Sequence, residues 1–505
     1  MSQSCAKRST RKVDAPPRPT LRLLRGGALP SLEVIKAVMS HRGIYELGAL
    51  IPDRSITGRP PAHPGYLLIA FGMLARHYRS GARAHAELSQ PEVWNHLVRQ
   101  AILARQEIGE ELWRQPGLEA VSWSAWRYAR DTYLANDHAI AEMAEIFTPL
   151  ALLDARSIGL LHPNGPGSWA HPDRSRIIYG DGTVIRPIYR PPVAVRVDAQ
   201  MKDSDADADG KVLRYPDLAT GELLGKPPRR YDPDGLLHHG HAGPVHGTNL
   251  VSFYARGDLP NQRIILGLDT VRSPGQEAST AVGLGLRIAG LVGDGAMAFV
   301  YDGALRGVHI ETLMSQAGML VINKVHASAT GVLTASGKKV RTQLLDIFVH
   351  DGIKGPCRHQ IGLLDGAVIE LVVNDRGEVL PGQVLERVQV KRSHRGTGLF
   401  HFNVAYQVSC PGDPSGGFLI WISPHSTKEG NHSRPDQMRV IPEVDTDFAG
   451  LYGLRPDSES ANALLKRGLI CDRSPSLGRK RLMVDMTCFS LLHNAITRHR
   501  FLNNM

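Results

Sequence analysis

Cysteine is scarce in this 505-residue sequence, and its few copies lie far apart. The odd number and the lack of any Cys-x-x-Cys pair argue against a disulfide framework or a zinc ribbon, and they fit a reducing compartment. The five positions are Cys5, Cys357, Cys410, Cys471 and Cys488. The sequence also lacks a secretory signal and an apolar run long enough to cross a bilayer. We therefore expect a cytoplasmic protein with no membrane partner.

Acidic residues are fewer than basic ones, with 49 Asp and Glu against 59 Lys and Arg, a net charge of +10 and a pI near 9.4. This balance suits a polyanionic partner such as nucleic acid, although a basic protein without that role has the same charge. A nucleotide-binding P-loop is missing too, because residues 221–227 lack one spacer residue and the Ser or Thr of that motif. The length predicts about two to four domains.

The N-terminal part divides into a basic arm and a helical region. Residues 1–27 carry seven Lys and Arg against one acid and predict a disordered arm, which either holds DNA phosphates or is simply solvated. Residues 28–160 are predicted to be helical, as a DNA-binding domain with a helix-turn-helix or as a plain bundle. In the first case, Arg127 and Arg130 are candidates for DNA contact. The expected helices are 66–78, 82–88, 91–104, 122–134 and 139–153.

Near the end of the chain, one carboxylate lies among two cations and a phenol. Tyr452, Arg455, Glu459 and Lys466 follow the pattern Tyr-x2-Arg-x3-Glu-x6-Lys. With 3.6 residues per turn, Glu459 and Lys466 share a helix face, and Arg455 lies one turn before Glu459. A metal-binding carboxylate flanked by phosphate-binding cations suits an enzyme that cuts or joins nucleic-acid backbones. An exposed helix face without such a role is the alternative.

This spacing resembles the signature around the third acid of DDE transposases of bacterial insertion sequences, in the group with a Tyr-Arg-Glu-Lys motif. The resemblance covers about 175–500 and implies two upstream aspartates, each at the end of a hydrophobic strand. Asp181 in Ile-Ile-Tyr-Gly-Asp-Gly and Asp302 in Ala-Phe-Val-Tyr-Asp-Gly match it. Taken singly, Asp-Gly is above all a turn dipeptide.

The elements expected between these motifs favour an α/β fold with an RNase H-like catalytic core. In that fold, the first and fourth strands lie side by side, which would bring Asp181 and Asp302 together. The predicted order is three strands, a helix, a strand, a helix and a strand. Their ranges are 176–189, 250–255, 263–268, 276–289, 297–301, 306–317 and 319–323.

The resemblance implies a transposase that cleaves and transfers DNA strands. Asp181, Asp302 and Glu459 would bind Mg²⁺, for which Mn²⁺ can substitute, with Asp181 bridging two ions. Arg455 and Lys466 would hold phosphates, and Tyr452 would stack on a displaced base or bind a phosphate. The expected partners are the terminal inverted repeats of an insertion sequence, target DNA and a second copy of the chain, at the nucleoid. The alternative is an inactive or nuclease-only DNA-binding protein of transposase ancestry.

The remaining sequence completes the expected layout. Residues 175–325 would form the first part of the core and 441–505 its C-terminal helices, the last of them amphipathic over about 479–500. Residues 326–440 are predicted to be a β-rich insertion between the second and third acids. It would either handle DNA or serve as a platform for dimer contact. Its candidate DNA-facing residues are Lys338, Lys339, Arg341, Lys391, Arg392 and Arg395.

Overall fold

A computed structural model describes most of the chain between residues 29 and 503. The expected basic arm, 1–27, lies outside the described residues, as do Lys338, Arg341, Arg395 and the side chain of Lys339. The other ranges outside the description are 53–61, 189–194, 201–208, 217–220, 226–231, 233, 241–242, 260, 327–331, 334–338, 341–342, 353–354, 395, 414–415, 429–430 and 471.

The N-terminal region is helical, as the sequence predicts. Local signals set the helix starts, because the side chains of Ser80, Ser122 and Asn136 each accept a hydrogen bond from the first turn that follows. The expected 122–134 helix is confirmed, but its second half is a π-helix. The elements are α2 (Ser31–Met39), α3 (Arg42–Gly48), α4 (Gly65–His77), α5 (Gly81–Leu88), α6 (Pro91–Ile108), α7 (Trp123–Ala129), the π-helix Arg130–Leu134 and α8 (Asp137–Ser157).

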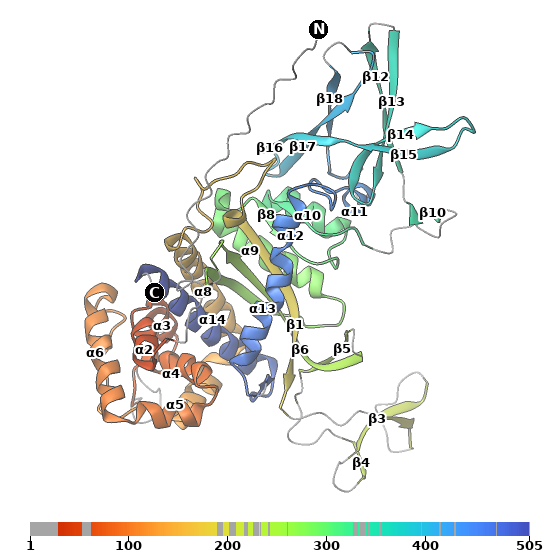
Figure 1. Cartoon of the computed structure of the whole chain (residues 1–505). Helices are drawn as coiled ribbons and strands as arrows, with labels where there is room; N and C mark the ends of the chain where they lie inside the picture. Colours follow the sequence, from red (N-terminus) through yellow and green to blue (C-terminus); the bar gives the residue numbers. More distant parts are fainter. Residues whose placement is uncertain are drawn as a thin grey trace, which may run out of the picture.

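The C-terminal helix α14 (Arg479–Leu502) lies inside the molecule rather than on its surface. It packs against α2, α4, α8 and the strand β7 (Arg263–Thr270), as Figure 1 shows for its place beside the N-terminal helices. The expectation of an amphipathic helix is wrong, because even its polar residues Asp485, Ser490 and Asn494 are buried. Helices from both ends of the chain therefore share one core.

A mixed sheet forms the centre of this α/β chain. Its strands lie in the order β7, β6 (Gly243–Arg256), β1 (Ile177–Pro187), β8 (Ala298–Val300) and β9 (Leu320–Ile322). β6 runs antiparallel to β1, whereas β8 runs parallel to it and pairs with Ile177–Tyr179. The predicted adjacency of the strands before Asp181 and Asp302 is thereby confirmed.

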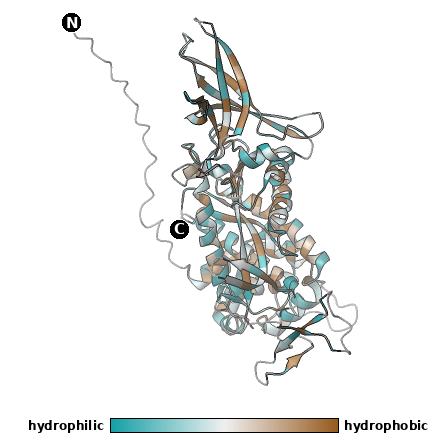
Figure 2. Cartoon of the chain, turned by 90° about the vertical axis from the view of Figure 1, so that its right-hand side faces the viewer, coloured by the Kyte–Doolittle hydropathy of each residue, from teal (hydrophilic) through white to brown (hydrophobic). Residues whose placement is uncertain are grey.

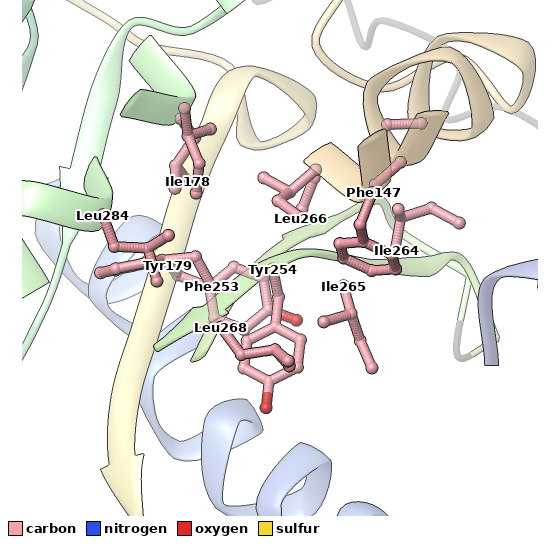
Figure 3. Close-up of a cluster of buried hydrophobic side chains, with 14 of the residues drawn as sticks. Phe147, Ile178, Tyr179, Phe253, Tyr254, Ile264, Ile265, Leu266, Leu268 and Leu284 are labelled. Carbon is pink, nitrogen blue, oxygen red and sulfur yellow. The ribbon is translucent and has the colours of Figure 1, made fainter. Parts of the chain in front are cut away.

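Helices cover both faces of this sheet. On one face, α8 and α9 (Glu277–Val292) meet at Gly267, where Thr148, Leu284 and Ile288 surround the backbone. Figure 3 shows Phe147 of α8 beside Ile264 and Leu266 of β7. On the other face lies α13 (Leu454–Arg467), which runs along β1 in Figure 1.

The region between the second and third acids is rich in strands, which gather at one end of the molecule in Figure 1. Hydrophobic and hydrophilic residues alternate along several of them (Figure 2), as expected for sheets with one covered face. One sheet contains β12 (Gln343–Gly352), β13 (Gly355–Leu364), β14 (Ala367–Val373) and β15 (Val379–Val384), and a second contains β16 (Glu386–His394), β17 (Phe400–Ser409) and β18 (Gly417–Ile422).

Two basic residues of β16 differ in their surroundings. Arg392 forms an ion pair with Asp294 and lies 4.3 Å above the ring of Trp169, so it fastens β16 to the rest of the chain. This position does not support the expected DNA contact of Arg392. Lys391 is exposed, with its ammonium 4.3 Å from the ring centroid of Trp421. Lys391 therefore remains available at the surface.

Among the helices that the structure describes, none has both the length and the apolar character needed to cross a bilayer.

Candidate active site

Asp181 lies on β1 and Asp302 lies just beyond the neighbouring parallel strand β8, so the two aspartates have different backbone settings. Asp181 is within β1, which stays paired with β6 as far as Ile185. Asp181 thus lies inside the strand expected over 176–189, which is confirmed, and not at the end of a strand as the resemblance implies. Asp302 is the second residue after β8, and its Oδ1 accepts a hydrogen bond of 2.9 Å from the N–H of Ala304 in the next turn.

The carboxylate of Asp181 is buried against α13. Its Oδ2 accepts hydrogen bonds of 3.2 Å from the hydroxyl of Ser458 and from the amide of Asn462. The pKa of Asp181 is raised to about 6, chiefly by burial and also by the nearby carboxylates of Asp302 and Glu277, against the opposing effects of Arg455 and the Ser458 hydrogen bond. Three acids therefore lie within electrostatic reach of one another around this strand.

The raised pKa of Asp181 predicts that the ionised carboxylate destabilises the fold. Because the folded pKa exceeds the ordinary value of 3.8, stability falls as the pH rises from about 4 through about 6. We expect Asp181→Asn to raise the free energy of unfolding above pH 6 by up to about 2–3 kcal/mol, and to leave it unchanged near pH 3. Urea unfolding of both proteins in EDTA across this pH range tests the expectation. An equal difference at all pH values would contradict it.

Glu459 is turned away from Asp181 in this structure. Its side chain is 63% exposed, and its Oε1 accepts a hydrogen bond of 3.0 Å from Arg455. Successive helical residues differ by about 100° in direction, so Glu459 cannot share the direction of Ser458, which contacts Asp181. The structure thus brings together two of the three expected acids. Asp457 is no substitute, because it is held in an ion pair by Arg263.

Cations lie on the Asp181 side of α13. Lys466 is half-buried, and its pKa is lowered by burial and by the positive charge of Arg186, against the opposing effects of Asp472 and Asp181. Arg186 is exposed and lies opposite Arg473, where β1 pairs with β19 (Arg473–Ser474). Like charges this close favour the binding of an anion between them.

Tyr452 and Arg455 belong to two consecutive helices. Tyr452 ends α12 (Phe448–Tyr452), and its ring stacks on Phe448 at 4.8 Å between centroids. The pKa of Tyr452 is raised by burial and by Asp302, and it is lowered by Arg455 and Lys324. The phenol therefore lies close to the second aspartate. Arg455 belongs to the first turn of α13, and its Nε is buried without a hydrogen-bond partner.

The two arginines expected to contact DNA from the N-terminal helices have different surroundings. Arg127 is exposed on α7. Arg130 is buried, and its guanidinium donates to Ser476 at 2.8 Å and to Asp485 at 3.4 Å. This placement does not support a DNA contact for Arg130. The sequence gives no indication of the contact between Arg130 and Asp485, because Asp485 lies 355 residues further along the chain.

Glu277, in the first turn of α9, is an acid that sequence reasoning missed. Its carboxylate accepts hydrogen bonds from Asn249 at 2.7 Å and from the hydroxyl of Tyr301 at 3.1 Å. It also lies against Gly182, where an added Cβ would be only 2.4 Å from its Oε1. In the sequence, Glu277 looks like an ordinary acid at the start of a helix, so only the fold reveals its position.

No three His, Cys, Asp or Glu side chains are already grouped as metal ligands in the part of the chain that the structure describes. The chain matches neither a protein-family model nor a curated protein.

Proposed function

We propose that this chain is a transposase with an RNase H-like core, which cleaves and transfers the strands of insertion-sequence DNA. The observation that carries the proposal is the pairing of β1 with β8, which brings Asp181 of β1 near Asp302, two residues beyond β8, while α13 with the Arg-Glu-Lys spacing packs against β1. The proposed DNA partners are terminal inverted repeats and a target site. A homodimer would hold the two ends together.

The carboxylates fit Mg²⁺ or Mn²⁺ in their chemistry. Asp181 and Asp302 supply the oxygen ligands that Mg²⁺ prefers, and a cation between them would offset the repulsion that raises the pKa of Asp181. Glu459 would supply a third carboxylate once it leaves Arg455. When bound, two such ions activate the attacking oxygen and stabilise the leaving oxygen of a phosphodiester.

The basic residues would position the DNA backbone. Lys466 and Arg186 would each hold a phosphate, because an anion would offset the electrostatic repulsion between these two neighbouring cations. Arg455 would bind a phosphate through its planar guanidinium and so release Glu459 from their ion pair. Substrate binding would in this way complete the set of three acids. Tyr452, beside Asp302, would contact the strand at the point of cleavage.

An alternative function has one observation in its favour. Because Glu459 points to solvent, the chain could bind DNA without cutting it, or cut without joining. Incubating the full chain with DNA from both flanks of its gene separates these functions. Strand cleavage that requires Mg²⁺ or Mn²⁺ supports the transposase. Binding with intact strands, in the presence of either metal, supports the alternative.

Lys466→Ala is expected to remove one phosphate contact. The logarithm of the DNA-binding constant should then depend less steeply on the logarithm of the salt concentration, by about one unit. Fluorescence anisotropy at several salt concentrations measures the slope. Lys36→Ala is the matched control, because Lys36 lies on α2 beside Glu33 and should leave the slope as it is. An unaltered slope in Lys466→Ala would remove this residue from the DNA interface.

A further inference from the structure

Glu277 lies near the open edge of β1 next to Asp181, a position that no sequence motif predicts. β8 pairs with β1 only as far as Tyr179, so the edge of β1 beyond that residue has no β8 partner. Side chains of consecutive strand residues point to opposite faces. Asp181 accordingly faces α13, and the Cα of Gly182 faces α9, where Glu277 lies. The two carboxylates approach this open edge from opposite faces of the sheet.

The surroundings of Glu277 hold its carboxylate at this edge without neutralising it. Asn249 and Tyr301 are neutral hydrogen-bond donors, and Tyr301 immediately precedes Asp302. The lack of a side chain at Gly182 provides the space that the carboxylate fills. Tyr301 thereby links Glu277 to Asp302, while Gly182, against which Glu277 lies, immediately follows Asp181. Three acids thus act on one small region.

We propose that Glu277 is a further acidic residue of the candidate active site, where it holds metal-bound water beside Asp181 and Asp302. The inference rests on the proposed function. Mg²⁺ and Mn²⁺ keep several waters when carboxylates bind them, and an acid behind the direct ligands then acts through those waters. Glu277 is therefore a positioning residue.

Glu277→Gln tests the role of the charge with little change in shape. The amide oxygen can still accept from Tyr301, and Asn249 can rotate its side-chain amide to present its unpartnered Oδ1. We expect Mn²⁺, titrated against the DNA-free full chain by electron paramagnetic resonance, to bind about 10-fold more weakly to this variant. Glu110→Gln is the control, because Glu110 is exposed and pairs with Arg105 of the N-terminal helix α6, so this variant should bind Mn²⁺ as the wild type does.

A second pair of variants distinguishes a specific loss of Mn²⁺ binding from a loss caused by misfolding. Gly182→Ala places a methyl group against the Glu277 carboxylate and should also weaken Mn²⁺ binding. In a Glu277→Ala background the same change should have no further effect, because its target is gone. Circular dichroism of each variant checks the fold.

The outcomes separate this inference from the proposed function. If wild-type protein binds Mn²⁺, Asp181→Asn loses it and Glu277→Gln retains full affinity, only the role of Glu277 is overturned. If neither wild-type protein nor Asp181→Asn binds Mn²⁺, the proposed active site itself is contradicted, and this inference with it.

Discussion

Replacing Asp181 or Asp302 with alanine is expected to abolish metal-dependent DNA cleavage and to leave DNA binding intact. Each carboxylate would bind a metal that stabilises transition-state charge by several kcal/mol, so the rate should fall by roughly 10³-fold or more. Binding should persist, because under the proposed function the phosphate contacts would come from Lys466, Arg186 and Arg455. Cleavage of labelled end DNA and anisotropy of the same DNA measure the two effects separately.

Glu110→Ala is the control for this loss of cleavage. Glu110 is exposed and pairs with Arg105 of the N-terminal helix α6, so its removal should preserve cleavage and binding alike. Full cleavage by either the Asp181 or the Asp302 variant would contradict their assignment. Parallel loss of cleavage in the control would show that the assay responds to general destabilisation.

Asp485→Ala is expected to destabilise the fold more than any surface substitution. Asp485 is 1% exposed and is the shared partner of Arg76, at 3.8 Å, and Arg130, at 3.4 Å. Its removal would leave two buried guanidinium groups without this carboxylate, at the junction of α4, the π-helix Arg130–Leu134 and α14. Breaking a buried pair from one side costs about 3–5 kcal/mol. Urea unfolding at neutral pH measures the loss.

Asp131→Ala is the comparison for this buried charge cluster. Asp131 also pairs with Arg130, at 2.9 Å, but it is 27% exposed and Arg130 keeps Asp485. Its loss should lower the free energy of unfolding by no more than about 1 kcal/mol. Similar losses for the two variants would mean that the cluster around Asp485 does not hold the two ends of the chain together.

The order of the central strands could be predicted, because it depends on local patterns. Short apolar runs between turn signals marked β1, β6, β7, β8 and β9, and topology then placed the first beside the fourth. The expected strand 176–189 already placed Asp181 inside a strand, whereas the resemblance implied that Asp181 ends one. Asp-Gly indicates a turn locally, whereas pairing with β6 keeps the chain extended through Gly182.

The parts that could not be predicted depend on contacts between distant segments. α14 has an apolar stripe, but packing against the N-terminal helices and β7 also buries its polar side. Arg130 meets a carboxylate far along the chain, and Glu277 gains its position from the fold of β1 and β8. The direction of the Glu459 side chain depends on which face of α13 packs against Asp181. The spacing of residues along a helix does not determine that face.

Joining of a DNA end to target DNA tests the central proposal most directly. A labelled fragment from one flank of the gene, with a free 3′ hydroxyl, would be incubated with full-length protein, plasmid target and Mg²⁺ or Mn²⁺. The account predicts labelled plasmid that forms only with metal and is absent with Asp181→Ala. A fragment that is bound by wild-type protein, yet never joined in either metal, would contradict strand transfer by this chain.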